Sequence, residues 1–137
     1  MAEDDKAERA AYHVEAARRR KAAESAKARV LLEGFVRDAQ ARGLPSTELV
    51  ARPWNGRGRY RTGRTGWYLK RDHSIAVGTD GAYYLLVVAP ERFGRWRGVA
   101  VEPSDPPLQV GEGARDGESA PLAEFLRLRL EARDDFP

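Results

Sequence analysis

The chain has 137 residues, a third of them charged, and a net charge of +3, so it is long enough for one domain with a substantial core. It contains no cysteine, which excludes disulfides and thiolate metal sites, and no apolar run near the roughly 18 residues that a membrane span requires. The N-terminus is charged and lacks the apolar core of a signal peptide, so we expect a cytoplasmic protein that does not bind membranes.

The positive charge is concentrated in the middle of the chain. From Val50 to Arg71 there are seven Arg or Lys residues and no acid, whereas acids outnumber bases from Glu102 to Pro137. Arginine is far commoner than lysine. A GC-rich genome and selection for anion binding are both adequate explanations of that bias.

Residues 1–27 are expected to form a separate, charged and Ala-rich extension. Helix propensity is high throughout, but only Tyr12 and Val14 offer an apolar anchor, so the segment is either a solvated helix or a frayed tail. Arg18 to Lys21 form a basic cluster, which fits a solvated face or a contact with nucleic acid.

Residues 28–137 are expected to form a single α+β domain, beginning with a helix. Gly43 is placed to end that helix in the C′ position, with Pro45 two residues further on. Beyond it, Ser46 to Glu48 start a short turn or strand leading to Val50. The helix has an apolar stripe of Leu31 or Leu32, Phe35, Val36 and Ala39.

The stretch from Arg57 to Ala89 gives the strongest structural signal and predicts four β-strands joined by three tight turns. We place a four-residue loop at Gly63–Gly66, a three-residue turn at Asp72–Ser74 and a two-residue turn at Asp80-Gly81. This choice of turns decides which side chains share a face, because a slip of one residue exchanges the two faces.

In this register one face is apolar and the other is basic. The apolar face carries Tyr60, Trp67, Leu69, Ile75, Val77, Tyr84, Leu86 and Val88. The reverse face carries Arg57, Arg59, Arg61, Tyr68, Lys70, Ala76, Gly78, Tyr83, Leu85 and Val87, with Arg59 opposite Lys70 and Arg61 opposite Tyr68.

The remainder of the chain predicts short elements and one more helix. We expect a helical turn over Pro90–Trp96, short strands at Val99–Val101 and Leu108–Val110, a loop over Gly111–Gly117 and a last helix with Ser119 as N-cap. That helix has Leu122, Phe125, Leu126 and Leu130 on one face and Leu128 outside it. The predicted fold is an antiparallel sheet of about five strands, a meander of hairpins, packed against the N-terminal and C-terminal helices, with Trp67, Phe35, Phe125 and Leu126 as core anchors.

The residue patterns of enzymes and metal sites are weak or missing. Asp72, His73 and Ser74 have the residue types of a hydrolase triad, but three consecutive positions cannot hydrogen-bond in relay order. The two histidines and the acids of the 112–118 region match no metal-binding spacing, and no glycine-rich stretch has a P-loop ending. We therefore expect no catalytic residue, no metal and no cofactor. An enzyme would need a site of Arg and Glu that the sequence does not locate, and a ligand bound beside Arg95 and Trp96 would indicate one.

The basic face gives the leading functional hypothesis, a non-enzymatic binding protein that contacts nucleic acid. Aromatic rings for bases and cations for phosphates are the groups that bind single strands. The candidate residues are Arg57, Arg59, Arg61, Arg64, Tyr68, Lys70 and Tyr83. Two alternatives remain: a purely structural face, or a protein-interaction or assembly module that uses the N-terminal helix.

Overall fold

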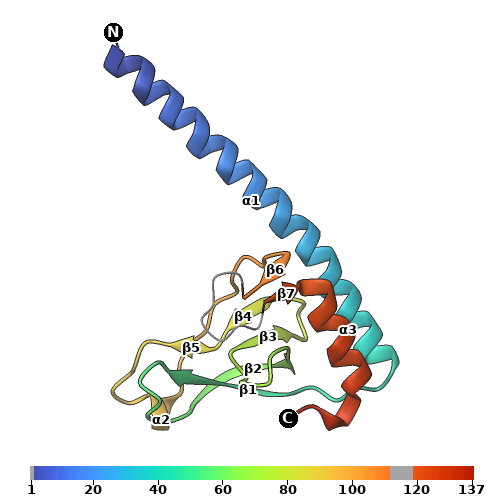
Figure 1. Cartoon of the computed structure of the whole chain (residues 1–137). Coiled ribbons are helices and arrows are strands. Elements are labelled where there is room, and N and C mark those ends of the chain that lie inside the picture. The colour runs from blue at the N-terminus through green and yellow to red at the C-terminus, as the bar shows by residue number, and fades with distance from the viewer. Residues whose placement is uncertain (1, 112–118) are drawn as a thin grey trace.

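The computed structural model describes residues 2–111 and 119–137 and has the α+β architecture predicted from the sequence (Figure 1). Its helices are α1 (Ala2–Ala41), α2 (Gly94–Arg97), α3 (Leu122–Ala132) and the 3-10 helix η1 (Arg133–Asp135). Its strands are β1 (Thr47–Pro53), β2 (Tyr60–Tyr68), β3 (Ile75–Gly78), β4 (Tyr83–Leu85), β5 (Val87–Val88), β6 (Gln109–Val110) and β7 (Ala120–Pro121). None of the helices in the described part of the chain is long and apolar enough to cross a membrane.

The five-stranded sheet rolls up, because one stretch of chain occupies both of its edges. The strand order is β4-β3-β2-β1-β5, and the two edge strands are separated only by Leu86. The extended segment that contains them pairs antiparallel with β3 and then parallel with β1, where the Arg52 N–H donates to the Leu86 carbonyl at 2.8 Å. The sheet therefore has an inner and an outer face, as a small barrel does.

Each face of the sheet buries its own apolar cluster. The inner cluster consists of Leu49, Ala51, Tyr60, Tyr68, Ala76, Tyr84, Leu86 and Val101. The outer cluster lies under α1 and α3 and consists of Ala28, Leu32, Phe35, Val36, Ala39, Leu44, Trp67, Leu69, Ile75, Val77, Tyr83, Val110, Leu122 and Leu126. The predicted anchors Phe35, Trp67 and Leu126 are buried in the outer cluster, and Phe125 packs against it.

The turn between β3 and β4 has three residues where the sequence predicted two. The Gly78 N–H donates to the Ala82 carbonyl, so Thr79, Asp80 and Gly81 form the loop. Gly81 has a φ of +82°, the left-handed conformation that this kind of loop requires at its last position. The Asp80 carboxylate accepts a hydrogen bond from the Ala82 N–H at 2.9 Å, which fixes the loop.

That extra loop residue reverses the predicted faces of everything from Tyr83 to Val88. The observed pairs are Ile75 with Leu85, Ala76 with Tyr84, and Val77 with Tyr83. Tyr83 therefore packs on the outer face with Ile75 and Val77, and Tyr84 packs inside with Ala76. The prediction was wrong because an Asp-Gly pair is compatible with loops of two and of three residues. One additional loop residue shifts the following strand by one position, which moves each of its side chains to the other face.

β2 is one continuous strand where the sequence predicted a hairpin. The predicted loop at Gly63–Gly66 lies inside it, at an irregularity in the pairing with β1. Thr62 Oγ1 donates to the Leu49 carbonyl at 2.6 Å and accepts from the Arg64 N–H at 3.1 Å, which holds the irregular part against β1. The partner of the first half of β2 is therefore β1, not the second half of β2.

The turn between β2 and β3 is longer than predicted, with no effect on the faces. The Leu69 N–H donates to the Ile75 carbonyl at 2.9 Å, so the loop spans Lys70–Ser74. The register differs from the predicted one by two residues, and a shift of two preserves the alternation of side chains. Trp67 and Leu69 accordingly lie on the predicted face.

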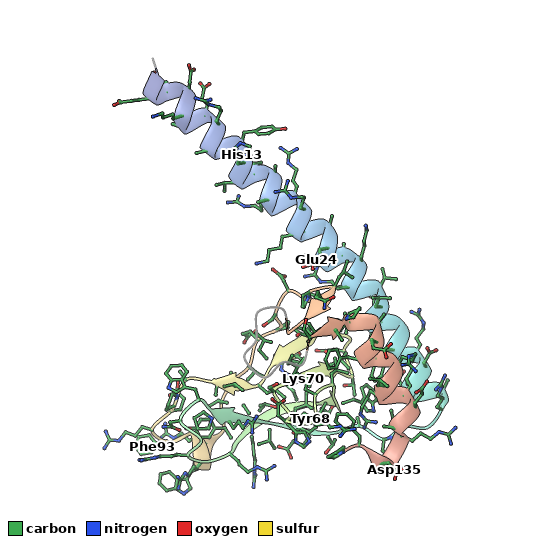
Figure 2. The ribbon with its side chains drawn as sticks, viewed as in Figure 1. His13, Glu24, Tyr68, Lys70, Phe93 and Asp135 are labelled. Atoms are coloured by element: carbon green, nitrogen blue, oxygen red, sulfur yellow. The ribbon has the colours of Figure 1, made fainter. Side chains whose placement is uncertain are left out.

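α1 is a single helix that passes residue 27 without a break. Its first half extends away from the rest of the molecule, and Figure 2 shows His13 on this extending part and Glu24 where the helix reaches the domain. There Glu24 Oε1 accepts from the Leu108 N–H, and Arg29 pairs with Asp105, both at 2.9 Å. The helix ends as predicted, with Gly43 at a φ of +68°.

The last part of the described chain differs from the prediction in its boundaries. β6 lies within the strand predicted at Leu108–Val110, but it pairs with β7 in a separate two-stranded sheet and does not join the five-stranded one. α3 starts at Leu122, and the residue before it is Pro121, so Ser119 is not its N-cap. Val99–Val101 forms no strand, and the predicted loop over Gly111–Gly117 lies almost wholly outside the described residues.

Candidate functional site

The seven residues predicted to bind nucleic acid do not share one exposed surface. Tyr68, Lys70 and Tyr83 are buried, with 8%, 4% and 4% of their surface exposed. Figure 2 shows Tyr68 and Lys70 near the middle of the molecule, and Tyr83 lies on the opposite face of the sheet from Tyr68. The predicted pairing of Arg59 with Lys70 is also wrong, because it depended on a hairpin that does not form.

Tyr68 is engaged inside the sheet. Its hydroxyl accepts a hydrogen bond from the Val50 N–H at 2.9 Å. Its ring stacks on the imidazole of His73, with centroids 3.8 Å apart and planes 5° from parallel. His73 lies in a turn, as predicted, with Nε2 3.0 Å from the Pro137 carbonyl oxygen. Buried and stacked in this way, the Tyr68 ring is not open to a nucleotide base.

Arg64, expected in the predicted loop at Gly63–Gly66, lies within β2 and is half-buried. One guanidinium nitrogen donates to the Val101 carbonyl at 3.3 Å, and Cζ lies 5.3 Å from the centre of the Tyr84 ring. These contacts connect Arg64 to the inner cluster and separate it from the exposed arginines.

Arg57, Arg59 and Arg61 are exposed, and the fold places the segment that contains α2 beside them. The Arg61 carbonyl accepts from the Val99 N–H at 2.9 Å. The side chain of Arg95 lies on Gly58, where an added Cβ would come within 2.9 Å of the arginine Nε. Three arginines predicted as a group are thus joined by others from a segment more than thirty positions away in the sequence.

Tyr60 of the inner cluster holds α2 in position. Gly94, the first residue of α2, lies against the Tyr60 ring so closely that an added Cβ would be 2.7 Å from a ring carbon. The Tyr60 hydroxyl donates to the Glu91 carbonyl at 3.2 Å and accepts from the Glu91 N–H at 3.1 Å. The helical turn predicted over Pro90–Trp96 exists in part, since α2 covers Gly94–Arg97.

Three large aromatic side chains are exposed at this end of the molecule. Trp96 is 79% exposed, Trp54 71% and Phe93 46%, and Figure 2 shows Phe93 at the edge of the molecule, far from Asp135. The ring centroids of Phe93 and Trp96 are 6.2 Å apart. Segments 54–61 and 92–97 meet where Arg95 lies on Gly58. We call their exposed arginines and aromatic rings the arginine–tryptophan patch; it consists of Trp54, Arg57, Arg59, Arg61, Arg92, Phe93, Arg95, Trp96 and Arg97.

The patch is hollowed and strongly basic. A hollow of about 360 Å³ lies between the loop before β2 and the α2 segment, with Arg57, Arg92, Arg95 and Trp96 in its wall and Glu91 as its acid. Two guanidinium groups lie 5.3 and 5.4 Å from the Phe93 ring centre. Among the described residues, no carboxylate forms an ion pair with any of the six arginines of the patch. These cations therefore remain available to an anion.

A larger hollow, of about 610 Å³, lies along α3, and Lys70 lines it together with residues of this helix. Arg129 in its wall is 9% exposed, and its Nε has no hydrogen-bond partner among the described residues. Burial lowers the pKa of Arg129, although the charge of Asp134 acts in the opposite direction. The Arg129 guanidinium lies over the Phe136 ring at 4.6 Å and donates to the Arg133 carbonyl, so it holds the end of the chain onto α3.

The described side chains offer little for bond-making chemistry. Within residues 2–111 and 119–137, no three His, Asp or Glu side chains are grouped so that they would hold a metal ion. The nine patch residues include no histidine, serine or carboxylate, and Glu91 is the acid that lines the hollow beside them. Its groups are suited to binding: guanidinium for phosphate or carboxylate, and aromatic rings for planar groups.

Similarity to known proteins gives no information on the function of this chain. No protein family, curated protein or solved structure matches the chain.

Six of the nine patch residues were absent from the predicted site: Trp54, Arg92, Phe93, Arg95, Trp96 and Arg97. Their signal in the sequence is the occurrence of several Arg together with Trp or Phe in two short segments, 52–61 and 92–97. The sequence predicts a helical turn over the second segment, but none of its residues was among the candidates for nucleic-acid binding. An amphipathic aromatic residue in a short polar segment, with no apolar stripe around it, indicates an exposed ring.

Proposed function

We propose that this protein binds single-stranded nucleic acid through the arginine–tryptophan patch, without catalysing a reaction. The observation that carries the proposal is the exposure of Trp54, Phe93 and Trp96 among six arginines that have no ion pair with any described carboxylate. Stacking of bases on such rings contributes about 1–3 kcal/mol per base, and the cations neutralise phosphates.

The arrangement favours an unpaired strand over a duplex. The bases of a duplex are stacked on one another, and their faces are not accessible to a protein ring unless a base is flipped out. Phe93 and Trp96 are close enough for neighbouring bases to use both rings, and Arg92 and Arg97 lie beside them. The hollow next to Arg57 and Arg95 has room for a phosphate group.

The ring contribution is tested by substituting Trp96 and measuring binding of a labelled single-stranded oligonucleotide by fluorescence anisotropy. Trp96→Ala is expected to weaken binding roughly 5- to 150-fold, the equivalent of one lost stack. Trp96→Phe, which retains a ring, is expected to lose much less. Unchanged affinity in Trp96→Ala, or a wild-type protein that binds no oligonucleotide at low salt, would exclude the proposal.

The charge contribution is tested with two double variants of equal net charge. In Arg57→Ala/Arg59→Ala we expect affinity to depend less steeply on salt, with a log–log slope smaller by about 0.7 for each phosphate that the variant no longer neutralises. The control is Arg37→Ala/Arg42→Ala, which removes two exposed arginines of the α1 region, distant from the patch. Equal slopes for the two variants would mean that binding follows net charge alone and that the patch is not the site.

A further inference from the structure

The first half of α1 has no packing partner within the described part of the chain. From Glu3 to Ala23 every side chain is exposed except Ala16, which is half-buried. Arg18, Lys21 and Ala22 line a hollow with Asp105, but the first tertiary hydrogen bond is that of Glu24 with Leu108, and the first buried side chain is Ser25. Figure 1 shows this half extending beyond the sheet and α3. Helices in proteins gain most of their stability from packing of one face, so the extending half lacks its main source of stability in a single copy.

The two ends of this half carry opposite charges. Residues 3–8 contain one lysine and four acids, Glu3, Asp4, Asp5 and Glu8, whereas residues 18–21 are all basic: Arg18, Arg19, Arg20 and Lys21. Glu15 lies 3.7 Å from the nearest nitrogens of both Arg18 and Arg19, and these exposed contacts are weak. The acids also suit the N-terminal end of a helix dipole, but the dipole gives no reason for four consecutive cations in the interior of a long helix.

Small residues connect the charged ends at heptad spacing. Ala7, Ala10, Val14 and Ala17 lie on one face of the helix, and Glu3 and Lys21 continue the same stripe in the two directions. Val14, in the middle, is 57% exposed. Alanine on both sides of a helix pair allows the two backbones to approach closely.

We propose that two copies of this chain associate through this face of α1, antiparallel and related by a two-fold axis. In the register that places Ala10 beside Val14 of the other copy, Ala7 lies beside Ala17 and Glu3 beside Lys21, while Asp4 and Arg18 flank the contact. The contact is isologous, so each favourable pair occurs twice. A parallel pair would oppose acids to acids and bases to bases, which disfavours that arrangement.

Charge reversal at one end or the other provides the experiment, with the mass in solution measured by light scattering over a range of concentrations. Wild-type protein is expected to reach twice the chain mass of 15.3 kDa as its concentration rises. Glu3→Lys/Asp4→Lys makes both ends positive, and Arg18→Glu/Lys21→Glu makes both ends negative, so each variant alone is expected to stay monomeric. An equimolar mixture of the two is expected to form heterodimers, because every facing pair is then complementary.

A matched pair of single substitutions tests the seam itself. Val14→Asp is expected to abolish association, whereas Tyr12→Asp, on an exposed side chain off the stripe, is expected to preserve it. A wild-type protein that remains monomeric at every concentration overturns the proposal. So does a mixture of the two reversed variants that stays monomeric, or a dimer that survives Val14→Asp.

Discussion

Tyr83 and Tyr84 are neighbours in β4, yet they belong to different clusters on opposite faces of the sheet. Tyr83 packs under the helices and makes no hydrogen bond through its hydroxyl to another described residue. Tyr84 is fully buried inside the rolled sheet, and its hydroxyl donates to the Asp80 carboxylate at 2.8 Å. The outer cluster is thus held by apolar contact with helices, together with the hydrogen bond that Trp67 Nε1 donates to the Leu44 carbonyl at 3.2 Å, whereas the inner cluster fixes the loops around it through tyrosine hydroxyls.

This difference decides what each cluster contributes to the molecule. The inner tyrosines reach three separate segments: Tyr60 bonds Glu91, Tyr68 bonds Val50, and Tyr84 bonds Asp80. The first of these bonds places the α2 segment, and so the arginine–tryptophan patch depends on the inner cluster. The outer cluster instead attaches α1, and its loss would free the helices before it disturbed the patch.

The largest expected effect comes from the helix side of the outer cluster. Leu32 is fully buried and its neighbour Leu31 is 36% exposed. Leu32→Ala is expected to lower the free energy of unfolding by about 2–5 kcal/mol, because it removes buried contacts and leaves a cavity. Leu31→Ala serves as the matched control and is expected to cost well under half as much. Urea denaturation followed by circular dichroism measures both, and equal losses would contradict the packing of α1 described above.

Alkaline pH is expected to act on both clusters together. Burial raises the pKa of Tyr83 to about 12, and burial together with the hydrogen bond to Asp80 raises the pKa of Tyr84 to about 12. In the unfolded chain these groups ionise near the ordinary pKa of 10.0, so the unfolded state loses its protons first. The free energy of unfolding therefore falls between about pH 10 and 12, by roughly 1.4 kcal/mol for Tyr83 at about pH 11. Tyr84 is expected to contribute less, because its partner Asp80 is exposed and water screens their interaction.

Denaturation at a series of pH values measures this loss, and absorbance at the tyrosinate band reports the ionisation itself. The double variant Tyr83→Phe/Tyr84→Phe retains the other tyrosines and is expected to show a much flatter profile. An equally steep profile in that variant would assign the alkaline loss to other groups.

Periodic patterns predicted the outer half of the fold well. The stripe of α1, the terminating Gly43 and the placement of Trp67 beside Ile75 follow from spacing alone, because a helix face and a strand face each have a fixed period. The choice between Leu31 and Leu32 stayed open in the sequence, since both fit the period. The packing of α1 on the sheet, which depends on contacts between residues distant in the sequence, buries Leu32 and leaves Leu31 36% exposed.

Local sequence patterns could not predict the inner cluster and the patch, for two reasons. Asp80-Gly81 fits loops of two or three residues, and the observed loop reverses the face of Tyr83 and Tyr84. The rolled sheet is also a long-range feature: β1 pairs with both β2 and β5, and this closure brings Trp54 to the end of the sheet where α2 lies. The arginines before β2 are exposed, but two of the three aromatic residues of the patch, Phe93 and Trp96, are distant from them in the sequence.

The smallest expected effect separates the two neighbouring tyrosines directly. Tyr84→Phe removes the hydrogen bond to Asp80 and is expected to cost about 1 kcal/mol, the typical net value of a hydrogen bond, because Asp80 is exposed to water. Tyr83→Phe removes a hydroxyl with no described partner and is expected to be near neutral. Because Asp80 also accepts from the Ala82 N–H, the three-residue turn should survive in both variants. Chemical denaturation at neutral pH measures the two costs, and a larger loss for Tyr83→Phe would show that the polar anchoring belongs to the outer cluster and reverse the comparison.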